Sequence, residues 1–128
     1  MFEVELLGDV YKVNACKTKY LADNSLAVVL TRRKETFADI TVNLGVKPTN
    51  DNCAFVDTNN NKWAEDFLKT NNIAVPTGRF ASSGFCMYPE YSFNLKKLKD
   101  LQDDMEMWYG NKKKRYYIDS WCWRVLFS

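Results

Sequence analysis

The sequence predicts an α+β domain in which two helices pack on an antiparallel β-sheet, a meander of about five or six strands. Three observations support this class. Apolar and polar residues alternate through much of the first half of the chain, which is the period of half-buried strands. Short polar turns separate these stretches and favour antiparallel pairing. Two later segments instead repeat apolar residues every three or four positions, as amphipathic helices do.

The strands are predicted from short runs that end in turn residues. Glycine, aspartate and asparagine follow most of these runs, and the charged tip Arg32–Glu35 separates two of them. The clearest alternation in the chain is Ala38–Leu44. The predicted strands are Phe2–Leu6, a stretch within Val10–Leu21, Leu26–Leu30, Ala38–Leu44, the apolar run Cys53–Val56, and Phe85–Tyr88, where Pro89 indicates an edge strand or a bulge.

Two helices are predicted after the meander. The first lies around Trp63 to Thr70 and packs on the sheet through Trp63, Phe67 and Leu68. The asparagines within Asp57–Asn61 are its expected N-cap, and Asn71–Asn72 is its expected left-handed stop. The second helix starts at a capping asparagine, Asn94, and ends at Gly110; its apolar stripe consists of Leu95, Leu98, Leu101, Met105 and Trp108.

Length and charge limit the organisation and the partners. The 128 residues fit a single domain over 1–128, with no repeat or linker, and 46% of them are hydrophobic. The 18 basic and 16 acidic side chains leave a net charge of +2. This near balance argues against an acidic mimic of nucleic acid and against a protein that is basic over its whole surface.

The chain contains no histidine, which excludes histidine-dependent catalysis and histidine-containing zinc sites. Its four cysteines, Cys16, Cys53, Cys86 and Cys122, are dispersed, and we expect them to be reduced and to bind no metal. No phosphate-binding glycine motif is present. Asp57, Asn59 and Asn61 match only the opening of a calcium loop, because Lys62 stands where glycine is needed. We therefore predict a protein that is not an enzyme and that holds no cofactor or metal.

The N-terminus and the cysteines indicate the compartment. The opening Met1–Leu6 carries acids where a signal peptide has a basic region and an apolar stretch. No segment approaches the roughly 20 apolar residues that a membrane span requires. We expect a cytoplasmic protein that does not associate with membranes.

The C-terminal segment 111–128 combines a basic run with many aromatic residues. We predict that it binds a partner through Lys112, Lys113, Lys114, Arg115, Trp121, Trp123 and Arg124, because tryptophan and arginine are enriched at interface hot spots. Two alternatives remain open. The stretch Tyr116–Phe127 also fits a final core strand, and cations beside aromatic rings also suit stacked single-stranded nucleic acid.

The central part of the chain resembles a family of short, uncharacterised proteins from Gram-positive bacteria, their phages and conjugative elements. The resemblance covers roughly Lys19 to Asn94 and brings no catalytic residue with it. The segment from Leu95 onward departs from the family body. The stretches that carry the resemblance are Ile40–Leu44, Ala54–Asn60, Trp63–Leu68, Pro76–Arg79 and Ser83–Phe93.

The resemblance implies a function in conflicts between mobile elements and their hosts. Small proteins of this setting, anti-CRISPR proteins among them, bind a defence protein of the host cell and have no active site. The expected function is stoichiometric, non-enzymatic inhibition of a host defence nuclease effector, of which a CRISPR nuclease is one kind. The alternatives are a single-stranded nucleic-acid-binding accessory protein of a mobile element and an enzyme of unrecognised type. A homodimer is also left open.

Overall fold

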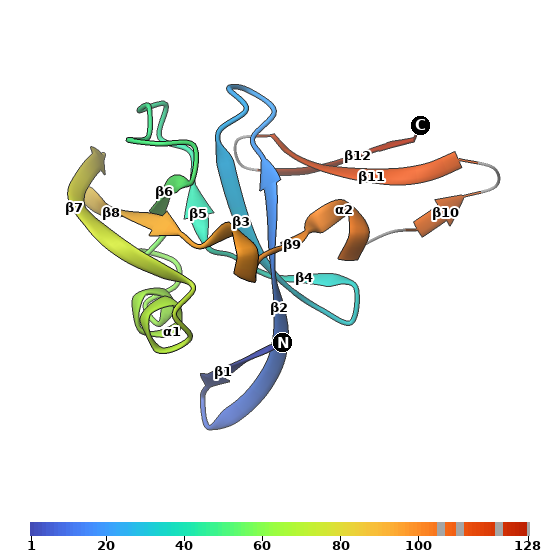
Figure 1. Ribbon diagram of the computed structural model, residues 1–128, viewed down its shortest axis with the longest axis horizontal. Helices are drawn as coiled ribbons and strands as arrows, with labels where there is room; N and C mark the ends of the chain where they lie inside the picture. The colour runs from blue at the N-terminus through green and yellow to red at the C-terminus, as the bar shows by residue number, and fades with distance from the viewer. Residues whose placement is uncertain (105–106, 110–111, 120–121, 128) are drawn as a thin grey trace.

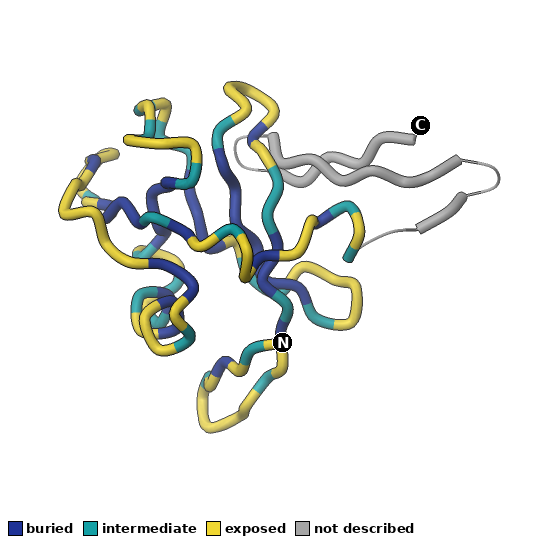
Figure 2. The backbone as a smooth tube through the Cα atoms, in the orientation of Figure 1, coloured by how far each residue is buried: buried dark blue, intermediate teal, exposed yellow. Residues whose placement is uncertain are grey.

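The computed structural model describes residues 1–104, 107–109, 112–119 and 122–127, the last three ranges by their backbone alone (Figures 1 and 2). Its first sheet confirms the start of the predicted meander, because four strands follow one another in antiparallel order. A short fifth strand pairs in parallel with the second. The strands are β1 (Phe2–Leu6), β2 (Asp9–Lys19), β3 (Leu26–Arg32), β4 (Glu35–Asp39) and β9 (Lys99–Asp100).

The remaining strands form separate sheets, which corrects the prediction of a single meander. The second sheet has the order β5-β6-β8-β7, and the third has the order β10-β11-β12. The second sheet consists of β5 (Thr41–Val42), β6 (Cys53–Val56), β7 (Ala74–Ser83) and β8 (Cys86–Phe93). The third consists of β10 (Met107–Tyr109), β11 (Lys112–Asp119) and β12 (Cys122–Phe127). The α+β class stands, with a mostly antiparallel architecture.

The chain passes from the first sheet to the second at Ile40. The predicted strand Ala38–Leu44 is therefore two strands, since β4 ends at Asp39 and β5 begins at Thr41. Ile40 is fully buried; its N–H donates to Val28 of the first sheet (3.0 Å), and its carbonyl accepts from Asp57 (2.8 Å). Alternation in the sequence predicts extended backbone but does not say which neighbour each residue pairs with.

One hydrophobic core joins the two sheets. Buried residues run along β3, β6 and the middle of β8, and the largest cluster of buried side chains draws on all three strands (Figure 2). Helix α1 (Ala64–Thr70) closes one side of this core. Phe67 and Leu68 are buried and Trp63 is half-buried, which confirms the predicted packing of the helix.

The sequence prediction is right for the C-terminal end of α1 and wrong for its N-terminal end. Asn72 has a left-handed φ of 55°, which confirms the expected stop. The predicted N-cap is wrong, because Trp63 occupies that position and makes no side-chain cap. The preceding residues close their own loop instead: the Asp57 carboxylate accepts from the Asn60 backbone and side chain, at 3.1 and 2.8 Å.

A row of aromatic contacts ties α1 to the first sheet. Phe67 meets Phe2 edge-on with ring centroids 6.2 Å apart, and it meets Trp63 at 5.9 Å. Trp63 contacts Phe37 at 6.5 Å, and Phe37 contacts Tyr11 at 5.4 Å. Such edge-to-face pairs contribute beyond the area they bury. The helix is thus held on β1, β2 and β4 by one continuous set of rings.

The predicted second helix is wrong. The segment instead forms a 3-10 turn η1 (Leu95–Lys97), strand β9 and a short helix α2 (Leu101–Asp104), followed by β10. Asn94 does cap η1, since its side chain accepts from the Lys96 N–H. Leu98 has an extended backbone, and both it and Leu101 are buried. The leucine spacing therefore spans several short elements, and Leu98 and Leu101 reach the core from two different ones.

Asp104 fixes the end of α2 to the first sheet. Its carboxylate accepts the Thr31 hydroxyl at 2.6 Å and the Asn14 side-chain amide at 3.0 Å. Cys16 lies beside this cluster, with its sulfur 3.6 Å from the Thr31 hydroxyl. Burial raises the pKa of the Cys16 thiol to about 12, so the thiol stays protonated near neutral pH.

None of the helices in the described ranges is long and apolar enough to cross a membrane.

The three cysteines whose side chains are described are free thiols of unequal exposure. Cys16 and Cys53 are buried, and Cys86 is partly exposed. We expect a thiol reagent to modify Cys86 first in the folded protein, and Cys16 only when the chain unfolds. In denaturant without reductant, the reagent should recover four thiols, Cys122 included. A lower count would reveal a disulfide, and rapid modification of Cys16 would contradict its burial.

Candidate functional site

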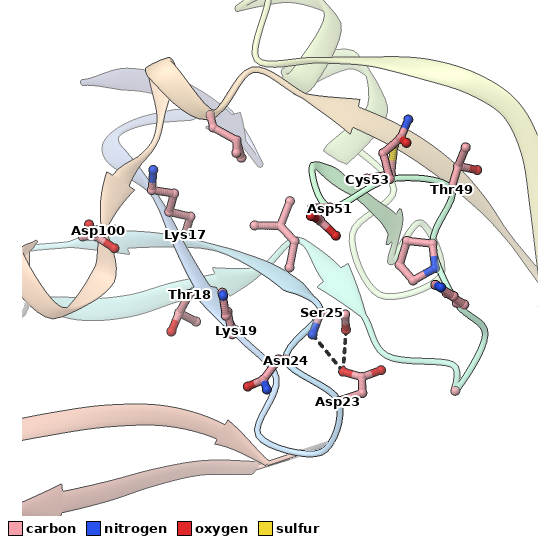
Figure 3. Close-up of a pocket in the computed structure, with 16 residues that line it drawn as sticks. Lys17, Thr18, Lys19, Asp23, Asn24, Ser25, Thr49, Asp51, Cys53 and Asp100 are labelled. Atoms are coloured by element: carbon pink, nitrogen blue, oxygen red, sulfur yellow. Dashed lines mark hydrogen bonds between the residues drawn. The ribbon is translucent and has the colours of Figure 1, made fainter.

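An open groove of about 1070 Å³ lies between the first two sheets (Figure 3). Its lining comes from β2, from the turn between β2 and β3, from the loop between β5 and β6, and from the η1–β9 segment. The lining residues are Lys17, Thr18, Lys19, Asp23, Asn24, Ser25, Leu26, Gly45, Lys47, Pro48, Thr49, Asn50, Asp51, Cys53, Leu95 and Asp100.

Strand β2 supplies a basic wall. Lys17 and Lys19 are two residues apart and therefore share one face of the sheet. In the register with β3 they lie opposite Val28 and Leu26, which both belong to the core. The two lysines thus stand at the margin of the core, where the apolar face of the sheet opens into the groove.

The loop between β5 and β6 forms the opposite wall, and it is tied at several points. The side-chain oxygen of Asn43 accepts the Gly45 N–H at 3.0 Å, and the backbone carbonyl of Asn50 accepts the Cys53 N–H at the same distance. The Asn52 amide donates to Ser92 of β8 at 2.9 Å. The wall is therefore a shaped surface rather than a free loop.

Glu90 of β8 is the main anchor of that wall. The residue is fully buried, and its carboxylate accepts the Thr49 N–H (2.8 Å), the Thr49 hydroxyl (2.6 Å) and the Thr77 hydroxyl (2.8 Å). Burial by itself raises the pKa of this carboxyl, but the hydrogen bonds from Thr49 and Thr77 and the charge of Arg79 outweigh it. The pKa of Glu90 therefore lies below its ordinary value, and the group is ionised at neutral pH.

Arg79 completes the anchor from the outer strand β7. Its guanidinium lies 3.4 Å from the Glu90 carboxylate and donates to the Lys47 carbonyl at 2.8 Å. The guanidinium also stacks over the Phe55 ring at 5.5 Å. A bulge between Pro76 and Phe80 makes this reach possible; Gly78 sits in it with a left-handed φ of +91°.

The turn between β2 and β3 closes one end of the groove. The Asp23 carboxylate accepts the backbone N–H and the hydroxyl of Ser25, at 3.0 and 2.6 Å, as Figure 3 shows. It also accepts from Asn43 of the opposite wall at 3.4 Å. This contact links the two walls at that end.

The groove carries separated charges of both signs. Lys17, Lys19 and Lys47 bring three ammonium groups, and Asp23, Asp51 and Asp100 bring three carboxylates. No ion pair joins any two of these six described side chains. The six groove charges therefore do not neutralise one another by direct contact, so a ligand that carries both signs can meet charges of both kinds in the groove.

Six of the seven predicted partner-binding residues are on the third sheet. Lys112, Lys113, Lys114 and Arg115 are on β11, Trp123 and Arg124 are on β12, and Trp121 lies outside the described residues. The register places Tyr117 opposite Arg124 and Ile118 opposite Trp123. Their side chains are not described, so the choice between interface and core strand stays a prediction.

Reasoning from the sequence did not find the groove. Lys17 and Lys19 fall within the stretch Val10–Leu21 that predicts a strand, and residues 45–52 fall between two predicted strands. One signal was present, since two lysines separated by one residue put their charges on a single strand face. Their meeting with Asp51 depends on how the two sheets pack, which no local pattern encodes.

The fold and groove define a mostly β, α+β domain with a charged cleft between two sheets. The chain belongs to the family described as "domain of unknown function (DUF4313)", whose family model matches residues 16–112. That range, about three-quarters of the chain, includes every residue that lines the groove. No curated protein and no solved structure matches the chain.

Proposed function

We propose that the protein acts by binding another protein, and that the groove receives an extended segment of that partner. The observation that carries this proposal is the set of lysines and aspartates that line one cleft without forming ion pairs with one another. A segment with both acidic and basic side chains satisfies both sets of charges. Complementary charges of this kind favour encounter with the right partner and disfavour wrong ones.

The size and openness of the groove favour a polypeptide over a compact ligand. Sites for small molecules enclose about 300–1,000 Å³ and bury most of their ligand. At about 1070 Å³ this groove lies just above that range, and it is not an enclosed cavity. Leu26, Pro48 and Leu95 add apolar surface between the charges, as a peptide with mixed side chains requires.

A nucleic-acid strand fits the groove less well. Its phosphates would gain from Lys17, Lys19 and Lys47 but would meet the carboxylates of Asp51 and Asp100 in the same cleft. The basic run on β11 keeps single-stranded nucleic acid as a second candidate ligand for the C-terminal sheet. A steep loss of binding to single-stranded DNA or RNA with rising salt would identify that activity.

The protein-binding proposal is tested with peptides of defined charge. We expect an eight-residue peptide of alternating glutamate and lysine to shift the backbone amide resonances of Lys17, Lys19 and Asp51. Peptides of glutamate alone or lysine alone should bind more weakly, because each meets like charges in the groove. Equal or tighter binding of the all-glutamate peptide would contradict the proposal.

Charge reversal supplies the matched control. Lys19→Glu should weaken binding of the mixed peptide, whereas Lys62→Glu makes the same change in net charge at an exposed position away from the groove and should leave binding unchanged. Loss of binding in both variants would indicate a general effect of net charge instead of a groove.

The more specific proposal is that the partner is a host defence nuclease effector, and that the protein inhibits it stoichiometrically, without turnover, in the bacterial cytoplasm. The resemblance to proteins of Gram-positive mobile elements and phages supports this setting, as does the near-neutral charge. Titration into cleavage assays with purified CRISPR nucleases tests it. We expect cleavage to fall in proportion to added protein and to stop at a fixed molar ratio. Inhibition far below that ratio would indicate an enzyme instead.

A further inference from the structure

Strand β7 is an outer strand of the second sheet. It pairs with β8 on one side, and the sheet order β5-β6-β8-β7 gives it no neighbour on the other side among the described strands. An unpaired strand edge offers a row of backbone donors and acceptors to any extended chain, so proteins usually protect such edges with charges, prolines or bulges.

Only the first half of β7 carries such protection. Pro76, Gly78 and Arg79 form the bulge that reaches Glu90. The hairpin that follows, residues 80–89, contains no charged side chain. Three of its large apolar side chains are exposed: Phe80 at 56%, Met87 at 60% and Phe85 at 109% of their reference areas. This half of the strand is an unprotected, apolar edge.

The register of the hairpin identifies the backbone groups on the open edge. Ser83 pairs with Cys86 across the two-residue turn Gly84–Phe85, so the backbone of Ser83 faces β8. Hydrogen bonding alternates along an antiparallel strand. Ala81 therefore also faces β8, and the N–H and C=O groups of Phe80 and Ser82 point away from the sheet.

We propose that this edge pairs with the same edge of a second copy of the chain, antiparallel and with the twofold axis at Ala81. Phe80 of one copy then lies opposite Ser82 of the other, and these residues exchange four backbone hydrogen bonds across the interface. Ala81 faces its own counterpart in a non-hydrogen-bonded pair, where the backbones approach most closely. The second sheet becomes continuous across the dimer.

The side chains of β7 suit this self-pairing. Alanine fits the close approach at the axis, and each large Phe80 faces a small Ser82. Met87 lies beside Ser82 in the hairpin, so it comes next to Phe80 of the other copy. The two Phe80 rings are diagonal neighbours across the axis. Because the stretch 80–89 is uncharged, two copies bring no like charges together.

Substitution of Ser82 tests backbone pairing directly. Ser82→Pro removes an N–H that points away from β8, so the β7–β8 ladder stays intact while the dimer loses two of its four interstrand bonds. Ser82→Ala keeps this N–H and is the matched control. In sedimentation equilibrium of the full chain over a range of concentrations, we expect a monomer–dimer equilibrium. Its dissociation constant should rise at least about tenfold in Ser82→Pro and stay near the original value in Ser82→Ala.

Three results would overturn the dimer. They are a wild-type protein that remains monomeric at every concentration, a Ser82→Pro variant that dimerises as well as the wild type, and equal weakening by Ser82→Ala. Unchanged thermal unfolding of Ser82→Pro at a concentration where the wild type is monomeric confirms that the variant folds. Because β7 does not line the groove, binding of the mixed peptide should persist in this variant, so the two proposals fail separately.

Discussion

Replacing Phe67 with alanine is expected to lower the free energy of unfolding by about 3–5 kcal/mol, the usual cost of removing a buried phenylalanine. Phe67 is buried and contacts both Phe2 and Trp63 edge-on, so the change opens a cavity and breaks the row of rings that holds α1 on the first sheet. Urea unfolding followed by circular dichroism measures the loss. Trp63→Ala should cost less than Phe67→Ala, because Trp63 is half-buried.

Phe85 provides the control for this prediction. It is the same residue type, but it is fully exposed at the tip of the β7–β8 hairpin. Phe85→Ala should leave the free energy of unfolding nearly unchanged when the protein is monomeric. If Phe67→Ala and Phe85→Ala had equal effects, the packing of α1 described above would be wrong.

Replacing Glu90 with alanine is expected to cost about 2–4 kcal/mol, because it leaves up to three donors from Thr49 and Thr77 without their acceptor. Arg79 is partly exposed and can turn toward water, so its loss of a partner adds little. Glu90→Gln keeps the shape and one acceptor oxygen, and it should cost less. The same unfolding experiment ranks the three proteins.

The fall in the free energy of unfolding at acidic pH gives a second measurement on Glu90. Its pKa is lowered in the folded protein from an ordinary value of 4.5, so the folded state binds this proton less readily than the unfolded state. The stability it contributes is fully present above pH 4.5 and is lost as the pH falls through the lowered folded pKa. Glu90→Gln should therefore lose less stability than the wild type over that interval. If the free energy of unfolding fell equally with pH in the wild type and in Glu90→Gln, the assignment of an ionised Glu90 would be wrong.

The Glu90 variants also connect stability to binding. Thr49 lines the groove and is held by Glu90, while Arg79 holds the carbonyl of Lys47. Loosening this wall makes it less well ordered before the ligand arrives, and ordering it on binding then costs free energy. A groove that depends on a shaped wall should bind the mixed peptide more weakly in Glu90→Ala even where the protein remains folded.

Local patterns predicted the elements that depend on local physics. The hairpin tip at Arg32–Glu35 is confirmed, with Arg33 and Lys34 both in the left-handed region that a tight two-residue turn requires. Helix α1 and its stop at Asn72 are confirmed for the same reason, since periodicity and a left-handed residue act over a few positions.

The failures concern partners that are distant in sequence. Alternation across Ile40 gave no sign that the chain changes sheets there. Leu98 and Leu101 had helical spacing, yet they reach the core from an extended residue and from a four-residue helix. The groove joins Lys17 to Asp51 and Asp100 through packing between sheets. Contacts of this kind depend on tertiary packing, which local sequence patterns do not predict.

Ile40 also has a consequence for how the molecule moves. Its N–H is bonded to the first sheet, its carbonyl is bonded to the residue that follows β6, and its side chain is fully buried. Thr41 extends the same link, because its hydroxyl accepts the Val28 N–H at 3.0 Å and lies 2.9 Å from the Tyr20 hydroxyl. Neither sheet can swing away while these bonds persist. The two sheets should therefore open as one cooperative unit, and fluctuations that widen the groove are confined to its loops.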